Sequence, residues 1–177
     1  ISERIKYIDF LSIKSEEIYS GISENREKLS IKYVCGNEEL EKKDINDIYD
    51  NMLFKINSSR KEDILLKSTS VGPHRDDLEI KIDNISARSF GSQGQQRSCA
   101  LALKLGESEI IKDITGENPV ALLDDVMSEL DEKRQDYVLN HIKERQVFLT
   151  CCDPSQVLRL CKGKSFLIES GKIKEER

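Results

Sequence analysis

The chain has 177 residues, of which 37% are hydrophobic and 34% are charged, a composition that excludes wholesale disorder. No apolar run approaches the roughly 20 residues that a membrane-spanning helix needs. The 28 basic and 33 acidic residues give a net charge of −5, which argues against a nucleic-acid footprint over the whole surface but leaves a local basic patch open.

The chain begins with Ile rather than Met, and no charged stretch precedes a short apolar segment at its start. We therefore expect a fragment of a longer protein, without a signal peptide. The five cysteines form no CxxC pair and no zinc-ligand spacing. This pattern predicts reduced thiols in a cytoplasmic protein.

The first third of the chain is predicted to be mainly helical. Residues 1–29 carry isoleucines at helical spacing in an otherwise charged segment, and residues 29–34 alternate as a short strand. Asp44 can cap a second helix. Both helices are more polar than those of a packed bundle, so we interpret residues 1–62 as a helical arm or lobe.

From residue 63 onward, apolar strands alternate with helices. This alternation is typical of an α/β domain whose sheet is mainly parallel and is flanked by helices. The predicted elements are, in chain order, a strand at 78–82, a turn at Asp83-Asn84, a helix at 94–113, a strand at 119–123, a helix at 131–143, a strand at 147–149, a short helix at 154–161 that starts at Pro154, and a terminal hairpin around Ser170-Gly171.

The strongest local signal is an apolar run that ends in the adjacent acids Asp124 and Asp125. Such a strand delivers two carboxylates to the carboxyl edge of a sheet, where ligands bind in open α/β folds. In P-loop ATPases an aspartate at this position helps to hold Mg²⁺, and a second acid can orient or deprotonate the attacking water. The structural alternative is a strand that simply runs into a polar turn.

A second signal precedes the long helix, where Ser92-Gln93-Gly94-Gln95 can present a hydroxyl and backbone N–H groups to an anion. An ordinary helix cap is the alternative for this segment. Gln95 lies 29 residues before Asp124, and Ser128-Glu129-Leu130-Asp131 follows the acids. The order of the three segments favours one shared function over unrelated turns.

These segments carry a family resemblance. Ser92–Gln95 resembles the signature motif of ABC-type ATPases, residues 122–125 resemble Walker B, and residues 128–131 resemble the D-loop. The strings GPHRDDL at 72–78 and GSQGQQR at 91–97 are similar to a narrower group, the RecF family of bacterial recombination and DNA-repair proteins. The resemblance covers essentially the whole chain as a C-terminal half. It implies the remainder of a helical arm at 1–62 and the C-terminal half of an ABC-type ATPase head at 63–177.

The resemblance also implies a nucleotide site between two protomers, in which ATP is sandwiched. Ser92 and Gly94 would contact the γ-phosphate held by the partner protomer, and Gln93 and Gln95 belong to the same nucleotide-binding segment. Asp131 would reach across the dimer interface.

For the acids, the resemblance implies that Asp124 binds Mg²⁺ and that Asp125 is the catalytic carboxylate. Most ABC enzymes have Glu at the second position, so the shorter Asp125 suggests slow hydrolysis. The switch histidine of ABC transporters has no counterpart after the following strand. Thr150 is therefore our candidate for a residue that senses the γ-phosphate.

A phosphate-binding loop of the form G-x-x-x-x-G-K-[ST] is missing from this sequence. Gly163-Lys164-Ser165 matches its ending, but Leu158 stands where the first glycine belongs, and residues 166–168 predict a strand instead of a helix. We expect the true Walker A loop in an N-terminal half. The intact parent would be a slow ATPase, and this chain alone is expected to be inactive.

The resemblance further implies ATP-dependent binding to duplex and gapped DNA, RecR and RecO as partners, and help in loading RecA at single-strand gaps during replication, recombination and the SOS response to DNA damage. No membrane is implied. One alternative is a non-enzymatic, SMC-like structural or dimerisation head. Another is a metal-dependent nuclease that uses the acids Asp76, Asp77, Asp124 and Asp125. His74 and Arg75 either lie near the nucleotide or the dimer surface, or they only fix a Gly-Pro turn.

Overall fold

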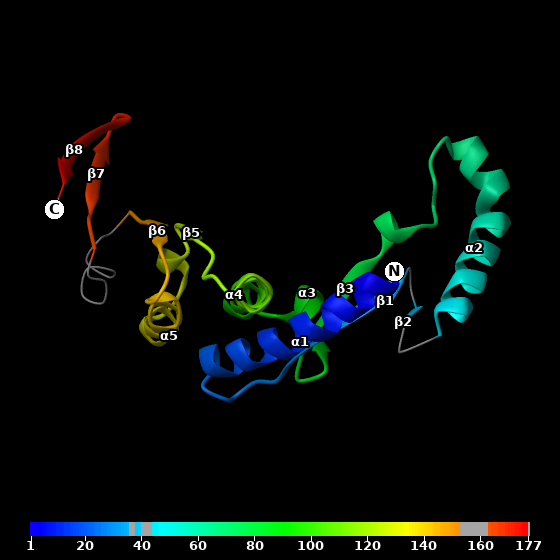
Figure 1. Ribbon diagram of the computed structural model, residues 1–177, viewed down its shortest axis with the longest axis horizontal. Coiled ribbons are helices and arrows are strands. Elements are labelled where there is room, and N and C mark those ends of the chain that lie inside the picture. Colours follow the sequence, from blue (N-terminus) through cyan, green and yellow to red (C-terminus); the bar gives the residue numbers. More distant parts are fainter. Residues whose placement is uncertain (36–37, 40–43, 153–162, 177) are drawn as a thin grey trace. The chain divides into compact units, whose positions relative to one another are not determined.

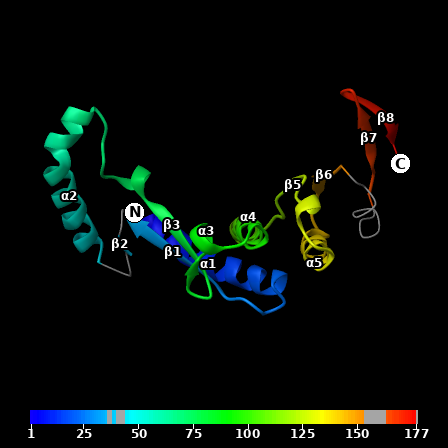
Figure 2. The ribbon, with the colours of Figure 1, turned by 180° about the vertical axis from the view of Figure 1, so that it is seen from behind.

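A computed structural model describes residues 1–35, 38–39, 44–152 and 163–176 of the chain (Figures 1 and 2). It divides the chain into two compact units, Ile1–Glu117 and Asn118–Arg177. In the part of the chain that the structure describes, no helix is both long enough and apolar enough to cross a membrane.

The first unit combines helices with an antiparallel sheet of four strands in the order β2-β1-β3-β4. Its elements are α1 (Ser2–Ile22), β1 (Leu29–Cys35), β2 (Glu38–Glu39), α2 (Ile45–Leu66), the 3₁₀ turn η1 (Pro73–Arg75), β3 (Asp77–Ile82), β4 (Ile85–Ser86), α3 (Ala87–Phe90) and α4 (Gln93–Thr115).

The centre of this sheet is the long pairing of β1 with β3, which runs from Leu29 opposite Ile82 to Val34 opposite Asp77. Every second side chain of β1 is buried, as expected for a strand with one face on a core. The predicted turn is confirmed: Asp83 and Asn84 both have positive φ, at 49° and 66°, which suits a two-residue hairpin between β3 and β4.

The core of the first unit lies where α1 packs on β1 and on α4. Leu11 and Ile18 of α1 and Leu101 and Leu105 of α4 are buried there. The predicted helix at 1–29 is shorter than expected and ends at Ile22. The chain leaves the helix because Glu24 and Asn25, just beyond it, adopt left-handed backbone angles.

The second predicted helix is present as α2, with Asp44 as its N-cap residue. None of its 22 residues is buried. The expected division into an arm at 1–62 and a head at 63–177 stays a prediction. The boundary between the compact units along the chain falls after Glu117, because α1 and β1 pack with β3 and α4 inside the first unit.

The second unit contains β5 (Ala121–Asp124), the 3₁₀ turn η2 (Met127–Glu129), α5 (Glu132–Ile142), β6 (Val147–Thr150), β7 (Phe166–Glu169) and β8 (Lys172–Glu176). Strands β5 and β6 are parallel neighbours joined through α5, and Asp124 lies opposite Thr150. α5 is amphipathic and buries Val138, Leu139 and Ile142. The terminal hairpin of β7 and β8 is also as predicted.

The α/β class is confirmed, but the mainly parallel sheet is not what the described strands form. Only β5 and β6 pair in parallel among them, and the other pairs are antiparallel. The reason is local in two cases, since two-residue turns join β3 to β4 and β7 to β8 and such turns allow only antiparallel pairing.

Two further sequence predictions concern the C-terminal region. The short helix predicted at 154–161 lies outside the described residues. Gly163-Lys164-Ser165 is followed by the strand β7, not by a helix. This agrees with our rejection of that segment as a phosphate-binding loop, because such a loop opens a helix.

Candidate functional site

The two predicted acids lie at the carboxyl end of the parallel strand pair. Asp124 is the last residue of β5, and Asp125 follows it in a left-handed conformation with φ of 52°. The hydroxyl of Thr150, at the end of β6, donates a hydrogen bond to Oδ1 of Asp124 and accepts one from the Asp125 N–H at 3.0 Å. One threonine hydroxyl thus ties both acids to the neighbouring strand.

The loop after the acids is also held by side chains. Ser128 Oγ donates to the carbonyl oxygen of Asp125 at 2.9 Å. Gln135 of α5 is buried and donates from Nε2 to the carbonyl oxygens of Met127 at 2.8 Å and of Leu130 at 3.0 Å. We call residues 125–131 the acid loop. Its conformation is fixed within the second unit.

Asp131 closes this loop and caps the next helix. Its Oδ1 accepts a hydrogen bond from the Arg134 N–H at 3.0 Å, and its Oδ2 lies 3.3 Å from the Arg134 side chain. An N-cap aspartate that satisfies a free N–H group is a common helix start. The predicted role of Asp131 at a dimer interface stays a prediction, and its carboxylate remains exposed.

The predicted signature segment forms the start of α4 through a complete capping box. Ser92 Oγ accepts from the Gln95 N–H at 3.2 Å, and Gln95 Oε1 accepts from the Ser92 N–H at 2.8 Å. The Ser98 hydroxyl donates to the carbonyl of Gly94 at 2.7 Å. Gln93 is exposed. The segment is therefore a rigid helix start that leaves its first residues open to solvent.

Gln95 also links the signature segment to the rest of the first unit. Its Nε2 donates to Glu27 Oε1 at 2.9 Å, and Glu27 Oε2 accepts from the hydroxyl of the buried Tyr19 at 2.6 Å. Gln96 Nε2 lies within 3.3 Å of three carbonyl oxygens between Ala87 and Gly91. These contacts fix the approach of the chain to α4.

Sequence reasoning missed Glu27, Gln96 and Gln135 as supports of the predicted site. The capping box itself has a readable pattern, serine followed by glutamine three residues later. Glu27 has none, because it lies 68 residues from Gln95. A buried glutamine in a polar helix such as α5 gives no signal in hydrophobic periodicity.

The structure brings Asp124, Asp125 and Thr150 together in the second unit. Ser92, Gly94 and Gln95 are together in the first unit, so the two predicted groups form no common site within either unit. Among the described residues, no group of three or more His, Cys, Asp or Glu side chains could hold a metal ion. Two carboxylates with hydroxyl neighbours still fit Mg²⁺, which prefers hard oxygen ligands and is usually held by one or two carboxylates plus substrate phosphates.

The Gly-Pro turn at 72–73 is fixed by local contacts. The His74 ring lies 3.1 Å from the Thr69 hydroxyl, and Arg75 donates to the Thr69 carbonyl. Gly72 has φ of 146°, and a Cβ there would lie 2.8 Å from the His74 ring. In this unit His74 and Arg75 therefore act on the turn itself.

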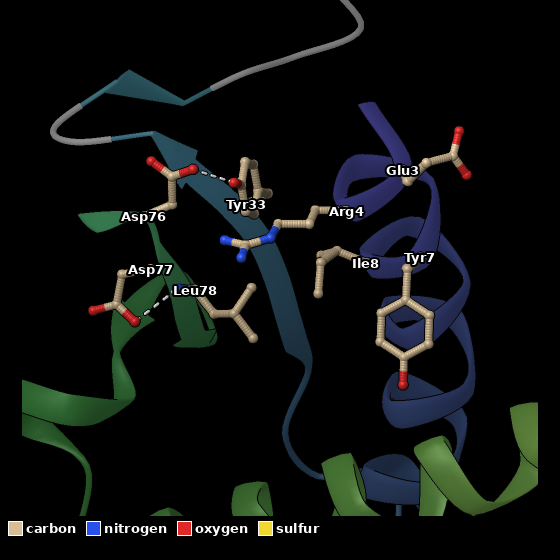
Figure 3. A pocket seen from close by; sticks show the side chains of 8 residues that line it. All are labelled: Glu3, Arg4, Tyr7, Ile8, Tyr33, Asp76, Asp77 and Leu78. Carbon is tan, nitrogen blue, oxygen red and sulfur yellow. Dashed lines mark hydrogen bonds between the residues drawn. The ribbon is translucent and has the colours of Figure 1, made fainter. Parts of the chain in front are cut away.

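A groove of about 410 Å³ lies next to this turn, between α1 and the start of β3 (Figure 3). The Arg4 guanidinium points into it and donates to the carbonyl of Pro73, and the Tyr33 hydroxyl donates to Asp76. Burial and the bond to Asp76 raise the pKa of Tyr33 to about 12. Asp77 pairs with Arg88 at 3.2 Å. These polar side chains of the groove thus each have a partner, either in the groove or beside it.

The chain is similar to several known proteins, although no protein-family model matches it. The DNA replication and repair protein RecF of Clostridium botulinum strain Langeland is 43% identical over 177 residues, which cover 98% of this chain and 47% of that protein. A solved structure of the recombination mediator protein RecF with ATP is 36% identical, with a TM-score of 0.79, and covers 98% of this chain and 45% of that one. An SMC ATPase structure with 15% identity and a TM-score of 0.58 shares the fold.

The chain therefore spans about half the length of the curated relatives it matches. Two of the segments that carry the family resemblance form the capped start of α4 and the end of β5 with its two acids. The identity extends along nearly the whole chain, which is therefore similar to the RecF proteins in a way that is consistent with their C-terminal half.

Proposed function

We propose that this chain supplies the signature helix, the Walker B acids and the D-loop to an ATP-driven dimer of a RecF-type DNA replication and repair protein. The observation that carries the proposal is the pair Asp124 and Asp125 at the end of a parallel strand, held by the Thr150 hydroxyl. Ligands bind at this edge in open α/β folds. The whole protein would act in the cytoplasm on duplex and gapped DNA.

In this proposal each group has a chemical task. Asp124 holds Mg²⁺, which would neutralise charge on the phosphates when bound. Asp125 orients or deprotonates the attacking water. Thr150 keeps both acids in place, and any sensing of the γ-phosphate would act through that same hydroxyl. Lys164 takes no part, since the Walker A loop is supplied from outside this chain.

The signature segment acts on the ATP held by a second protomer. Ser92 and Gly94 contact the γ-phosphate, and Gln93 and Gln95 complete the segment, where helical N–H groups favour an anion. Asp131 faces the other protomer. Dimerisation would then create the DNA-binding groove and give RecO and RecR a defined surface, so that RecA is loaded at single-strand gaps.

The test is ATP-dependent dimerisation of the full-length protein that contains this chain, measured by sedimentation with Mg-ATP. Ser92→Asp keeps an acceptor for the Gln95 N–H and hence the helix cap, but it places a negative charge against the phosphate. We expect dimerisation to be lost in Ser92→Asp and kept in Ser92→Asn, which caps equally well without charge. The trans contact would be refuted if both variants dimerise with ATP. It would also be refuted if neither the variants nor the wild type dimerise.

Hydrolysis needs a separate assay. We expect the 177-residue chain to show no turnover and the full-length protein to lose turnover in Asp125→Asn. If the 177-residue chain alone hydrolyses ATP and Asp125→Asn abolishes this activity, the assignment of the Walker A loop to a segment outside the chain would be overturned.

One observation favours the alternative function, a structural or dimerisation head without catalytic activity. The Asp124 carboxylate already accepts from Thr150, so the acids could serve to shape the turn. A full-length protein that dimerises equally with and without ATP would support this alternative. The nuclease alternative finds less support, because Asp76 and Asp77 are engaged by Tyr33 and Arg88.

A further inference from the structure

Gln135 is a buried polar side chain of the second unit that faces the acid loop. It is 3% exposed, and its amide Nε2 donates to two carbonyl oxygens of that loop, those of Met127 and Leu130. Burying an amide is costly unless its hydrogen bonds are satisfied. These two bonds therefore give Gln135 a definite orientation and give the loop two fixed points.

The two fixed points enclose the 3₁₀ turn η2. Between them the Leu130 N–H bonds the Met127 carbonyl at 3.3 Å, and the side chains of Met127 and Leu130 are buried. Ser128 and Asp131, by contrast, are exposed. The loop is thus anchored from inside by α5, while its polar side chains face outward.

We propose that Gln135 is a positioning residue, which sets the acid loop in the shape that a second protomer meets. This inference rests on the proposed ATP-driven dimer. The amide of Gln135 bonds the loop at Met127 and Leu130, so its effect on the interface would pass through the loop. The loop is prepared before the partner arrives, which removes the cost of ordering it at the interface.

The first test measures the loop directly in the 177-residue chain by amide hydrogen exchange. Gln135→Met keeps the volume but removes the amide donors, so that the Leu130 carbonyl loses its side-chain partner and the Met127 carbonyl is left with the Leu130 N–H. We expect the amides of residues 127–131 to exchange at least about tenfold faster, with the amides of β5 and β6 unchanged. Gln146→Met, at an exposed glutamine after α5, is the matched control and should change nothing.

A second variant separates positioning from mere packing. In Gln135→Glu the carboxylate has no donor, whereas the protonated carboxyl regains one. Protection of the loop should therefore recover as the pH falls through the usual glutamate range, from about 7 to about 4. Unchanged loop exchange in Gln135→Met, or equal acceleration throughout the second unit, would overturn the proposal.

The third measurement uses the full-length protein. We expect Gln135→Met to leave ATP binding by the monomer within about twofold of the wild type and to weaken ATP-dependent dimerisation about tenfold. Changed loop exchange with unchanged dimerisation would overturn the role of the loop at the interface. A wild type that does not dimerise with ATP would instead refute the proposed function, and the exchange data would still decide the positioning of the loop.

Discussion

The two units of the chain cover their sheets to different degrees. In the first, α1 buries alternate residues of β1, and α4 packs behind α1. In the second, one face of the parallel pair is open, with Leu122 75% exposed and Phe148 58% exposed. The signature segment thus belongs to a unit whose core is covered by helices. The acids lie at the end of an open sheet, where the hydrogen bonds of the Thr150 hydroxyl, more than burial, hold their geometry.

The largest expected effect on stability comes from replacing a leucine by alanine, a change that can be made in the sheet or core of either unit. Leu105→Ala removes a side chain that is 4% exposed from the first core and should cost about 3 kcal/mol of unfolding free energy. Leu122→Ala should cost less than about 0.5 kcal/mol in the 177-residue chain, because its side chain already faces water. Hydrogen exchange in each unit measures both values.

The same two substitutions, Leu105→Ala and Leu122→Ala, also compare the two units in the full-length protein. Parallel sheets are normally covered on both faces, so the cost at Leu122 should rise toward that at Leu105 when the rest of the polypeptide is present. Equal small costs at Leu122 in both forms would mean that the open face is open in the whole protein as well.

The second prediction concerns alkaline pH. Burial raises the pKa of the Cys99 thiol from its ordinary value of 9.0 to about 11. The folded first unit thus favours the neutral thiol, so its stability is intact below about pH 9 and falls by about 2 kcal/mol as the pH rises to about 11. Denaturant titrations at several pH values check this slope.

The control for this prediction is Cys152, an exposed thiol of the second unit. Cys99→Ala should flatten the loss of stability between pH 9 and 10, whereas Cys152→Ala should leave it unchanged. Tyr33, with its pKa near 12, contributes only above about pH 10. A slope that persists in Cys99→Ala would assign the loss to another group.

The third prediction tests how closely α1 approaches α4. A Cβ on Gly106 would lie 2.7 Å from the hydroxyl oxygen of Ser15, which is buried and has no hydrogen-bond partner among the described residues. Gly106→Ala should therefore cost about 1–2 kcal/mol. In the background of Ser15→Ala the same change should cost less, and a double-mutant cycle measures the coupling. Additive costs would show that the helices separate without resistance.

The sequence predicted most elements because their patterns are local. The alternation of Leu78, Ile80 and Ile82 and the apolar run before Asp124 both became strands. The pairing partners were not predictable in the same way. Whether β3 pairs with β1 or with a later strand depends on contacts distant along the chain, and the expectation of a mainly parallel sheet failed on that point.

The candidate site shows the same division. The motifs located Ser92, Asp124 and Asp125, since their residue types and order are read directly from the sequence. Their supports could not be predicted: Glu27 meets Gln95 across 68 residues of sequence, and Gln135 anchors the loop through bonds that α5 makes to residues before it. Their tasks follow from tertiary geometry, which residue spacing does not encode.

The smallest expected effect is at Thr150. Thr150→Val keeps the shape of the side chain but removes the hydroxyl that joins both acids, while the Asp125 N–H retains the Thr150 carbonyl at 3.2 Å. Because the site is exposed, we expect a loss of only about 1 kcal/mol in the second unit. Thr150→Ser should restore it, since a serine hydroxyl can make the same two bonds. In the full-length protein the valine variant should lower turnover more than ATP affinity. If Thr150→Val keeps the stability of the wild type and Thr150→Ser loses it, the methyl group and not the hydroxyl holds the turn, and the acids on the open sheet would then depend on packing as the first unit does.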